Sequence, residues 1–265
     1  MNLSTNARIF FVGGLISYRG LFQWIRPSVY IPTMLGAPLF QILFFTYLGR
    51  YADTGESDSF FIVGNAIQVC SMAAVYGMTM AVANERQFGT LGPLLASPAN
   101  RAAIFLGRGV PVLVNGLVVS CFGFLVGVVF LDFRPAAGAW PALAVDVVVT
   151  AASCTAFGML LGSIGLYGRD FFFVANLAYF LMLLFCGVNV PLSVLPGWMQ
   201  DISRCLPLTH GIAAAREIAA GASLSSVSGL VWTELGIGVA WATAGFVLFR
   251  VLERASQRRA VLDTF

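Results

Sequence analysis

Long apolar runs tile almost the whole chain, and they restrict its fold more than any other feature. A spanning helix needs about 20 apolar residues to cross a hydrocarbon core of roughly 30 Å. The runs that are long enough lie at 28–48, 60–83, 102–131, 140–166, 171–190 and 229–250. They leave no room for a soluble domain among 265 residues. We therefore expect an all-α integral membrane protein with six spans, forming a single domain over 1–265.

The charges indicate how the chain sits in the membrane. Only 10% of the residues are charged and 58% are hydrophobic, whereas charged residues make up about a quarter of a soluble domain. Lysine is absent, so arginine alone supplies the positive charge. Because positive loops stay in the cytoplasm, both termini are expected there, with Arg50, Arg134, Arg204 and Arg216 left outside. The net charge of +3 reflects this topology and does not indicate nucleic acid binding.

The two ends of the chain lie outside the predicted spans. Residues 1–27 interleave apolar residues with arginines and end at Pro27, a pattern typical of a helix in the headgroup plane. Residues 251–265 are predicted to form a cytoplasmic tail.

Polar residues inside the spans should face protein, because an unpaired polar group in lipid is costly. Asn65, Gln68 and Tyr76 lie near one stripe of the second span, and Asp146 lies on the fourth. These faces either line a water-filled route or form interhelical hydrogen bonds. Asp146 and Glu234 are both placed near the outer ends of their spans, where we expect an interfacial or helix-packing role.

Pairs of small residues predict close helix contacts. Gly123 and Gly127 in the third span, and Gly158 and Gly162 in the fourth, have the spacing that lets helix backbones approach each other.

The segment 191–228 differs from every other loop. Its apolar residues have helical spacing, and its prolines stand where helices are expected to start. We predict two short helices that dip into the outer leaflet as a re-entrant hairpin; a folded external loop is the alternative. The residues assigned to this exit gate are Pro191, Pro196, Trp198, Pro207, His210 and Arg216. His210 is the only histidine, and without acidic or cysteine neighbours it is not expected to be a catalyst or a metal ligand.

A polar segment over 84–98 separates the second and third spans. A charged turn followed by a short amphipathic helix forms a surface to which a partner protein can bind. The chain itself cannot hydrolyse ATP through a phosphate-binding loop, because that motif requires a lysine. Any ATPase activity must belong to another polypeptide.

Two blocks of sequence are similar to a known family. The first runs Asn84-Glu85-Arg86-Gln87-Phe88-Gly89-Thr90-Leu91, with Leu94-Leu95-Ala96-Ser97-Pro98 after it, and it resembles the E-R-x-x-G-T-L signature of ABC-2 type transporter permeases. The second is formed by Pro191 to Pro196, Trp198, Leu206-Pro207-Leu208-Thr209-His210, Arg216 and Gly221. The resemblance is strongest to the branch that exports drugs, lipids and lipo-oligosaccharides, including daunorubicin-resistance and nodulation-factor permeases.

The resemblance implies a non-catalytic permease of a bacterial inner membrane. It would dimerise with an identical or paralogous protomer and bind two copies of a cytoplasmic ABC ATPase. ATP and Mg would be held by that ATPase, and no cofactor or metal by this chain. The residues implied to couple the two subunits are Glu85, Arg86, Gly89, Thr90 and Leu91. The cargo would be an amphipathic drug, lipid or glycolipid, exported by alternating access.

Two other classes of protein are alternatives to a permease. A proton-coupled secondary transporter would use Asp146 or Glu234, although the spans show no convincing inverted repeat. A membrane-embedded enzyme would need acidic pairs or a histidine at the membrane surface, and the sequence offers neither.

Overall fold

The computed structural model describes residue 28 and residues 31–52, 55–87, 101–165 and 171–260. Within these ranges the regular structure is entirely helical, with eight α-helices and no strand. The all-α prediction is thus confirmed for the described part of the chain. The predicted interfacial helix over 1–27 and most of the segment 84–98 lie outside it.

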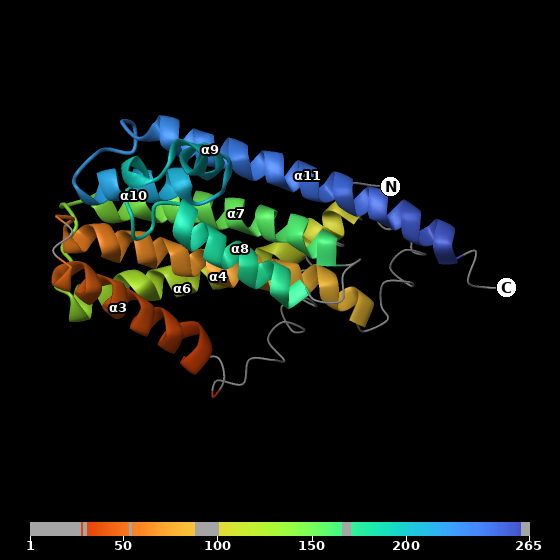
Figure 1. Cartoon of the computed structure of the whole chain (residues 1–265), viewed down its shortest axis with the longest axis horizontal. Helices are drawn as coiled ribbons and strands as arrows, with labels where there is room; N and C mark the ends of the chain where they lie inside the picture. The colour runs from red at the N-terminus through yellow and green to blue at the C-terminus, as the bar shows by residue number, and fades with distance from the viewer. Residues whose placement is uncertain (1–27, 29–30, 53–54, 88–100, 166–170, 261–265) are drawn as a thin grey trace.

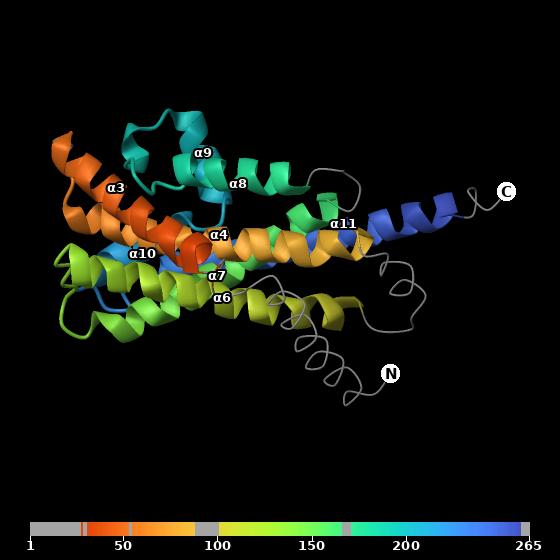
Figure 2. The same ribbon diagram turned by 90° about the horizontal axis from the view of Figure 1, so that it is seen from below.

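Among the described residues, five helices are long and apolar enough to cross a membrane. In chain order they are η1 with α3 (Ile31–Gly36 and Ala37–Tyr51), α4 (Asp58–Gln87), α6 (Arg101–Phe130), α7 (Ala139–Gly165) and α11 (Ser228–Ala260). Successive helices from α3 to α7 run in opposite directions, whereas α11 runs parallel to α7, as Figures 1 and 2 show from two sides. The first and last helices continue beyond their predicted ends, to Tyr51 and Ala260.

The fifth predicted span is shorter than expected. Helix α8 (Phe171–Phe185) has 15 residues, about 22 Å at the usual rise and less than the hydrocarbon thickness. The prediction that this span extends to residue 190 is wrong. Gly187 has φ +72, a left-handed conformation that commonly terminates helices. The described chain therefore has five helices of spanning length and one shorter apolar helix.

The two short helices predicted after α8 are present. A 3-10 turn, η2 (Leu192–Val194), precedes α9 (Gly197–Cys205) and α10 (Thr209–Ala219). We call residues 191–219 the hairpin, and the end of the bundle that holds it the hairpin end (Figure 1). Helix α10 packs against α4, α7 and α11, with most of its residues buried. Helix α9 is more exposed, with Trp198 and Ile202 on its surface.

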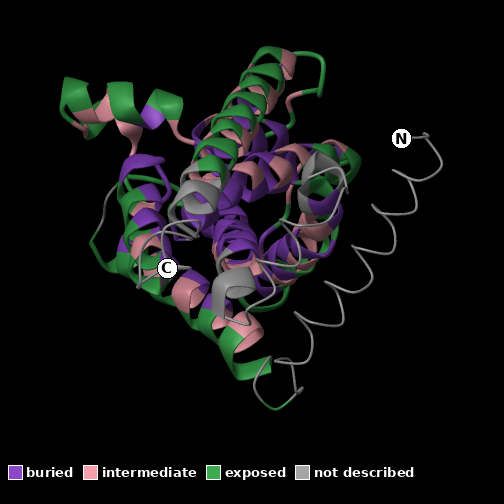
Figure 3. Ribbon diagram, turned by 90° about the vertical axis from the view of Figure 1, so that its right-hand side faces the viewer, coloured by how far each residue is buried: buried purple, intermediate pink, exposed green. Residues whose placement is uncertain are grey.

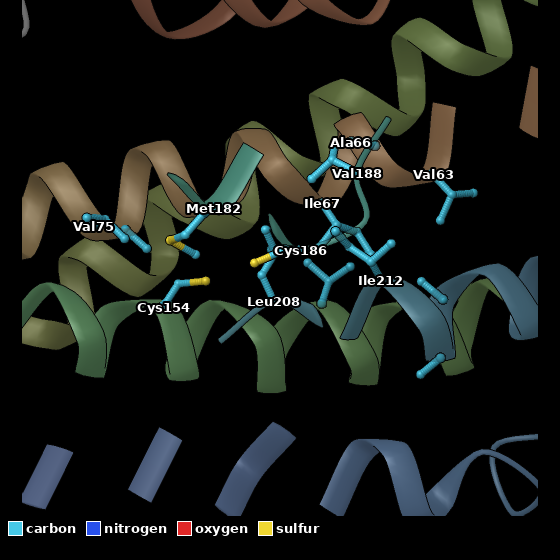
Figure 4. Packing of buried hydrophobic residues seen from close by; sticks show 14 of the residues in the cluster. Val63, Ala66, Ile67, Val75, Cys154, Met182, Cys186, Val188, Leu208 and Ile212 are labelled. Carbon is cyan, nitrogen blue, oxygen red and sulfur yellow. The ribbon is translucent and has the colours of Figure 1, made fainter. Parts of the chain in front are cut away.

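The core lies around α4, which contacts α3, α6, α7, α8 and α10. Residues 61–71 of α4 are all buried. Figure 3 shows buried residues on the inward faces of the helices and exposed ones outside. In Figure 4, Ile67 of α4, Cys154 of α7, Met182 of α8 and Ile212 of α10 pack in one cluster.

The outer faces are also apolar. Large exposed side chains include Phe44 of α3, Val129 of α6, Phe180 of α8 and Trp232 of α11. Large apolar side chains exposed on so many helices are unsuited to water and suit a lipid environment.

The glycine pairs lie at close helix contacts, as predicted. A Cβ added at Gly158 would lie 2.9 Å from the carbonyl oxygen of Val75, and one at Gly162 would lie 2.7 Å from Cβ of Val82. A Cβ at Gly123 would lie 3.0 Å from Cα of Ala66. These glycines therefore bring α7 and α6 against the backbone of α4, an arrangement common in membrane bundles.

Candidate functional site

The predicted coupling segment begins inside a helix. Helix α4 continues without a break to Gln87, so Glu85 and Arg86 belong to its last turn and not to a separate turn. Gly89, Thr90 and Leu91 lie outside the described residues, as does the predicted amphipathic helix. The coupling function of these five residues stays a prediction.

Asn65 is the centre of a polar network between α3, α4 and the chain after α8. Its side chain is fully buried. Gln41 Nε2 donates to Asn65 Oδ1 at 3.0 Å, and Asn65 Nδ2 donates to Asn189 Oδ1 at 2.7 Å. The hydroxyl of Tyr179 donates to Gln41 Oε1 at 2.7 Å. Helices α3, α4 and α8 and the chain after α8 are thus joined by side-chain amides and one phenol.

The same network continues toward the opposite end of the bundle. Gln68, also fully buried, donates from Nε2 to the carbonyl oxygen of Tyr179 at 3.5 Å. The hydroxyl of Tyr76 donates to Asn176 Oδ1, and the rings of Tyr76 and Tyr179 are 6.3 Å apart. We call the set of Gln41, Asn65, Gln68, Tyr76, Asn176, Tyr179 and Asn189 the polar track. Three of the four predicted pathway residues belong to it.

Four members of the polar track were missed by sequence reasoning. Gln41, Asn176, Tyr179 and Asn189 are polar residues within apolar runs, which is a signal that could have found them. The apolar runs alone do not show that these four residues face the stripe of α4 that carries Asn65, Gln68 and Tyr76.

Asp146, the fourth predicted pathway residue, lies elsewhere. It is fully buried on α7, as is Glu234 on α11, and the two carboxyl groups are close enough to interact electrostatically. Neither acid reaches the surface of the described chain, which favours the predicted helix-packing role over an interfacial one. Because α7 packs along α11 as well as α4, this part of α7 meets α11 and the hairpin.

Glu234 accepts hydrogen bonds from the start of α10. Its Oε1 accepts from the backbone N–H of Leu208 at 2.8 Å, and Oε2 accepts from that of Gly211 at 3.3 Å. Such N–H groups have no partner within their own helix, and a carboxylate at a helix N-terminus is favourable. Leu208 has φ +89, an unfavourable conformation for a residue with a side chain. Glu234 therefore holds a strained helix start in place from another helix.

Arg216 binds backbone oxygens near the other end of α10. Its Nε and Nη2 donate to the carbonyl oxygen of Phe60 at 3.3 and 3.1 Å, and Nη2 also donates to that of Val188 at 2.8 Å. The guanidinium carbon lies 3.5 Å from the centre of the Phe60 ring. Burial lowers the pKa of Arg216 to about 9, so the side chain is still charged at pH 7.

The remaining predicted gate residues shape the hairpin. Pro191 and Pro196 immediately precede η2 and α9. Trp198 is exposed and its ring contacts that of Phe185 edge to face. The carbonyl oxygen of Pro207 lies 3.5 Å from Sγ of Cys186, and a ring nitrogen of His210 lies 3.3 Å from the carbonyl oxygen of Arg204.

Three arginines at the hairpin end form ion pairs with nearby aspartates. Arg50 pairs with Asp58 at 2.6 Å, Arg134 with Asp132 at 2.7 Å and Arg204 with Asp201 at 3.2 Å. With Arg216 bound to carbonyl oxygens, each arginine that the topology placed outside has a local partner.

Asp146 is expected to destabilise the fold. Both of its carboxyl oxygens are buried and accept no hydrogen bond from any described protein group, and Glu234 is nearby. Asp146→Asn removes the charge and the repulsion between the two carboxyl groups, and should therefore raise the free energy of unfolding by about 1–3 kcal/mol, within the usual range for a single substitution. Thermal unfolding in lipid nanodiscs measures this change. Asp201→Asn, at an exposed pair, is the control and should change little; a lower melting temperature for Asp146→Asn would contradict the expectation.

A helical bundle with apolar outer faces, polar side chains inside and a hairpin packed into one end is a multi-pass membrane protein. The family model described as ABC-2 type transporter matches residues 14–219, and the chain belongs to this family. The resemblance seen in the two sequence blocks is thereby confirmed.

Several relatives are permeases by name. The chain is 30% identical over 241 residues to the probable doxorubicin resistance ABC transporter permease protein DrrC of Mycobacterium tuberculosis (strain ATCC 25618 / H37Rv), covering 86% of this chain and 84% of DrrC. It is 27% identical over 192 residues to the probable multidrug ABC transporter permease YbhR of Escherichia coli (strain K12), covering 72% of this chain and 52% of YbhR. The chain thus spans about half the length of YbhR.

Proposed function

We propose that this chain is the membrane-spanning permease subunit of an ATP-driven exporter. The observation that carries the proposal is the family match over residues 14–219. The names of DrrC and YbhR support a drug as the cargo. An amphipathic lipid or glycolipid is the alternative implied by the sequence resemblance, and either would be moved outward by alternating access. Energy would come from a separate ATPase, since a chain without lysine cannot form the phosphate-binding loop.

The proposed orientation has both termini in the cytoplasm of a bacterial inner membrane, with the hairpin end outside. Most arginines then lie at the cytoplasmic end, as expected from the positive-inside rule. Arg50, Arg134 and Arg204 are exceptions at the hairpin end. Their positive charges are neutralised, because each pairs with an aspartate.

The polar track is the proposed route for the polar part of the cargo. Its side chains are uncharged, so they can hydrogen-bond a headgroup without the desolvation cost of a buried charge. Tyr76, Gln41 and Asn189 are only partly buried, which leaves them open to contact from outside the subunit. A second permease protomer, identical or paralogous, would complete the passage. The hairpin would then act as its exit gate.

The proposed contact with the ATPase is the segment 84–98, centred on Glu85 and Arg86 at the end of α4. Charged side chains there can form charge-assisted hydrogen bonds with the motor subunit, and Gly89, Thr90 and Leu91 continue the contact. Two ATPase copies would bind one permease dimer. ATP and Mg would be bound by the ATPase, with no cofactor or metal in this chain.

The test is co-expression of this chain with the ABC ATPase encoded nearest to it, followed by co-purification and transport into inverted membrane vesicles. We expect the two to co-purify, and Glu85→Ala to reduce ATP-dependent transport by about tenfold, the effect of losing roughly 1.4 kcal/mol of coupling. Glu217→Ala, at an exposed position of α10, serves as the control. A chain that associates with no ATPase and transports without ATP would refute the proposal.

A proton-coupled transporter is the second candidate, favoured by the buried carboxyl groups of Asp146 and Glu234. It predicts transport that is unaffected by ATP depletion and lost in Asp146→Asn. Glu234 already accepts two backbone hydrogen bonds, which supports a structural function for that acid.

A further inference from the structure

Two charged side chains hold α10 near its two ends, and they connect it to different helices. Glu234 of α11 accepts hydrogen bonds from Leu208 and Gly211 at the start of α10. Arg216, in the last turns of α10, donates to the carbonyl oxygens of Phe60 and Val188. At the hairpin end, α10 thus links α11 to α4.

The Arg216 contact requires a residue without a side chain at position 64. A Cβ at Gly64 would lie 2.4 Å from the carbonyl oxygen of Val188 and 2.7 Å from Nη2 of Arg216. Glycine at this position is what allows the guanidinium, the first turns of α4 and the chain after α8 to meet. The contact is also rigid, because the guanidinium is planar, binds two carbonyl oxygens and stacks on the Phe60 ring.

Helix α4 extends from this contact to the proposed coupling residues. It is one continuous helix of 30 residues, about 45 Å long, with Phe60 in its first turn and Glu85 and Arg86 in its last. A shift or tilt of such a helix at one end is carried to the other. Both α4 and α11 pack along α7, and α10 connects them through hydrogen bonds made by charged groups.

We propose that Arg216 is the positioning residue through which movement of α4 reaches the hairpin. Glu234 holds the opposite end of α10 on α11 and serves as the pivot, with Leu208 at the joint. When the partner ATPase displaces the end of α4, Arg216 draws the end of α10 with it. This inference rests on the proposed function, since it requires an ATPase that acts on α4.

The test measures transport and ATP hydrolysis in the same reconstituted complex. Arg216→Gln and Arg216→Lys remove the planar, two-carbonyl contact, and Gly64→Ala disrupts it while keeping the charge. All three should lower the transport rate by about tenfold or more, as expected for hydrogen bonds to a charged group, while ATP hydrolysis stays within about twofold of the unaltered complex. Arg204→Gln, on the exposed face of α9 and in an ion pair with Asp201, should leave both rates unchanged.

Two other results would overturn the inference, and a third would refute the proposed function instead. Equal losses of transport and hydrolysis, with a lower melting temperature, would show that Arg216 only stabilises the fold, and would overturn the inference. Unchanged transport in Arg216→Lys and Arg216→Gln would also overturn it. An unaltered complex without ATP-dependent transport would instead refute the proposed function.

Discussion

Glu234→Ala is expected to lower the free energy of unfolding by about 2–5 kcal/mol, because each buried N–H group left without an acceptor costs about 1–3 kcal/mol. The groups concerned are the N–H of Leu208 and the N–H of Gly211. Glu234→Gln should cost less, since the amide oxygen can still accept one of the two hydrogen bonds. Thermal unfolding in lipid nanodiscs, followed by tryptophan fluorescence, measures both changes.

Glu217→Ala is the matched control for this prediction. It removes the same side chain from an exposed position of α10, where a substitution should change stability by less than about 0.5 kcal/mol. Equal melting temperatures for Glu234→Ala and Glu217→Ala would show that the cap on α10 contributes nothing measurable.

Gly158→Leu combined with Gly162→Leu is expected to prevent α4 and α7 from packing. A Cβ at Gly158 would meet backbone atoms of Val75 at 2.9 and 3.0 Å, and one at Gly162 would lie 3.2 Å from backbone atoms of Thr79. Backbone atoms cannot rotate away as a side chain can. Even the single change Gly162→Ala should cost about 1–3 kcal/mol through overpacking. Size-exclusion chromatography and thermal unfolding of the purified variants measure the loss.

Gly236→Ala on α11 is the control for the glycine variants. Apart from the local backbone of α11 itself, no described atom lies within 4 Å of a Cβ added there, and alanine stabilises a helix relative to glycine by up to about 1 kcal/mol. We therefore expect unchanged or slightly higher stability for Gly236→Ala. A double leucine variant that elutes and melts like the unaltered protein would contradict the close contact between α4 and α7.

The helices could be predicted from the sequence because hydrophobic length is a local property. The runs at 102–131 and 140–166 correspond to α6 and α7 within a residue at each end. The prediction of a span over 171–190 was wrong, because the left-handed backbone conformation of Gly187 ends α8. The residues that follow are still apolar, so hydrophobic length did not show this end. Two short helices after it were predicted from prolines and helical spacing, and both are present.

The candidate site was predicted only in part. Asn65, Gln68 and Tyr76 do share one side of α4, as their spacing indicates, and they belong to the polar track. Asp146 was grouped with them, yet it faces Glu234 and the hairpin. Helical periodicity shows which residues share a face, but it does not show which neighbouring helix that face meets.

By itself, the sequence determined the class of protein, the approximate helices and the family resemblance, since these depend on composition, apolar length and short motifs. Only the tertiary structure decided the partners of the charged groups. Glu234 binds residues 23 and 26 positions away, and Arg216 binds an oxygen 156 positions away. Such pairings depend on how the helices pack, because a buried charge is stabilised by whichever polar group the neighbouring helix brings to it.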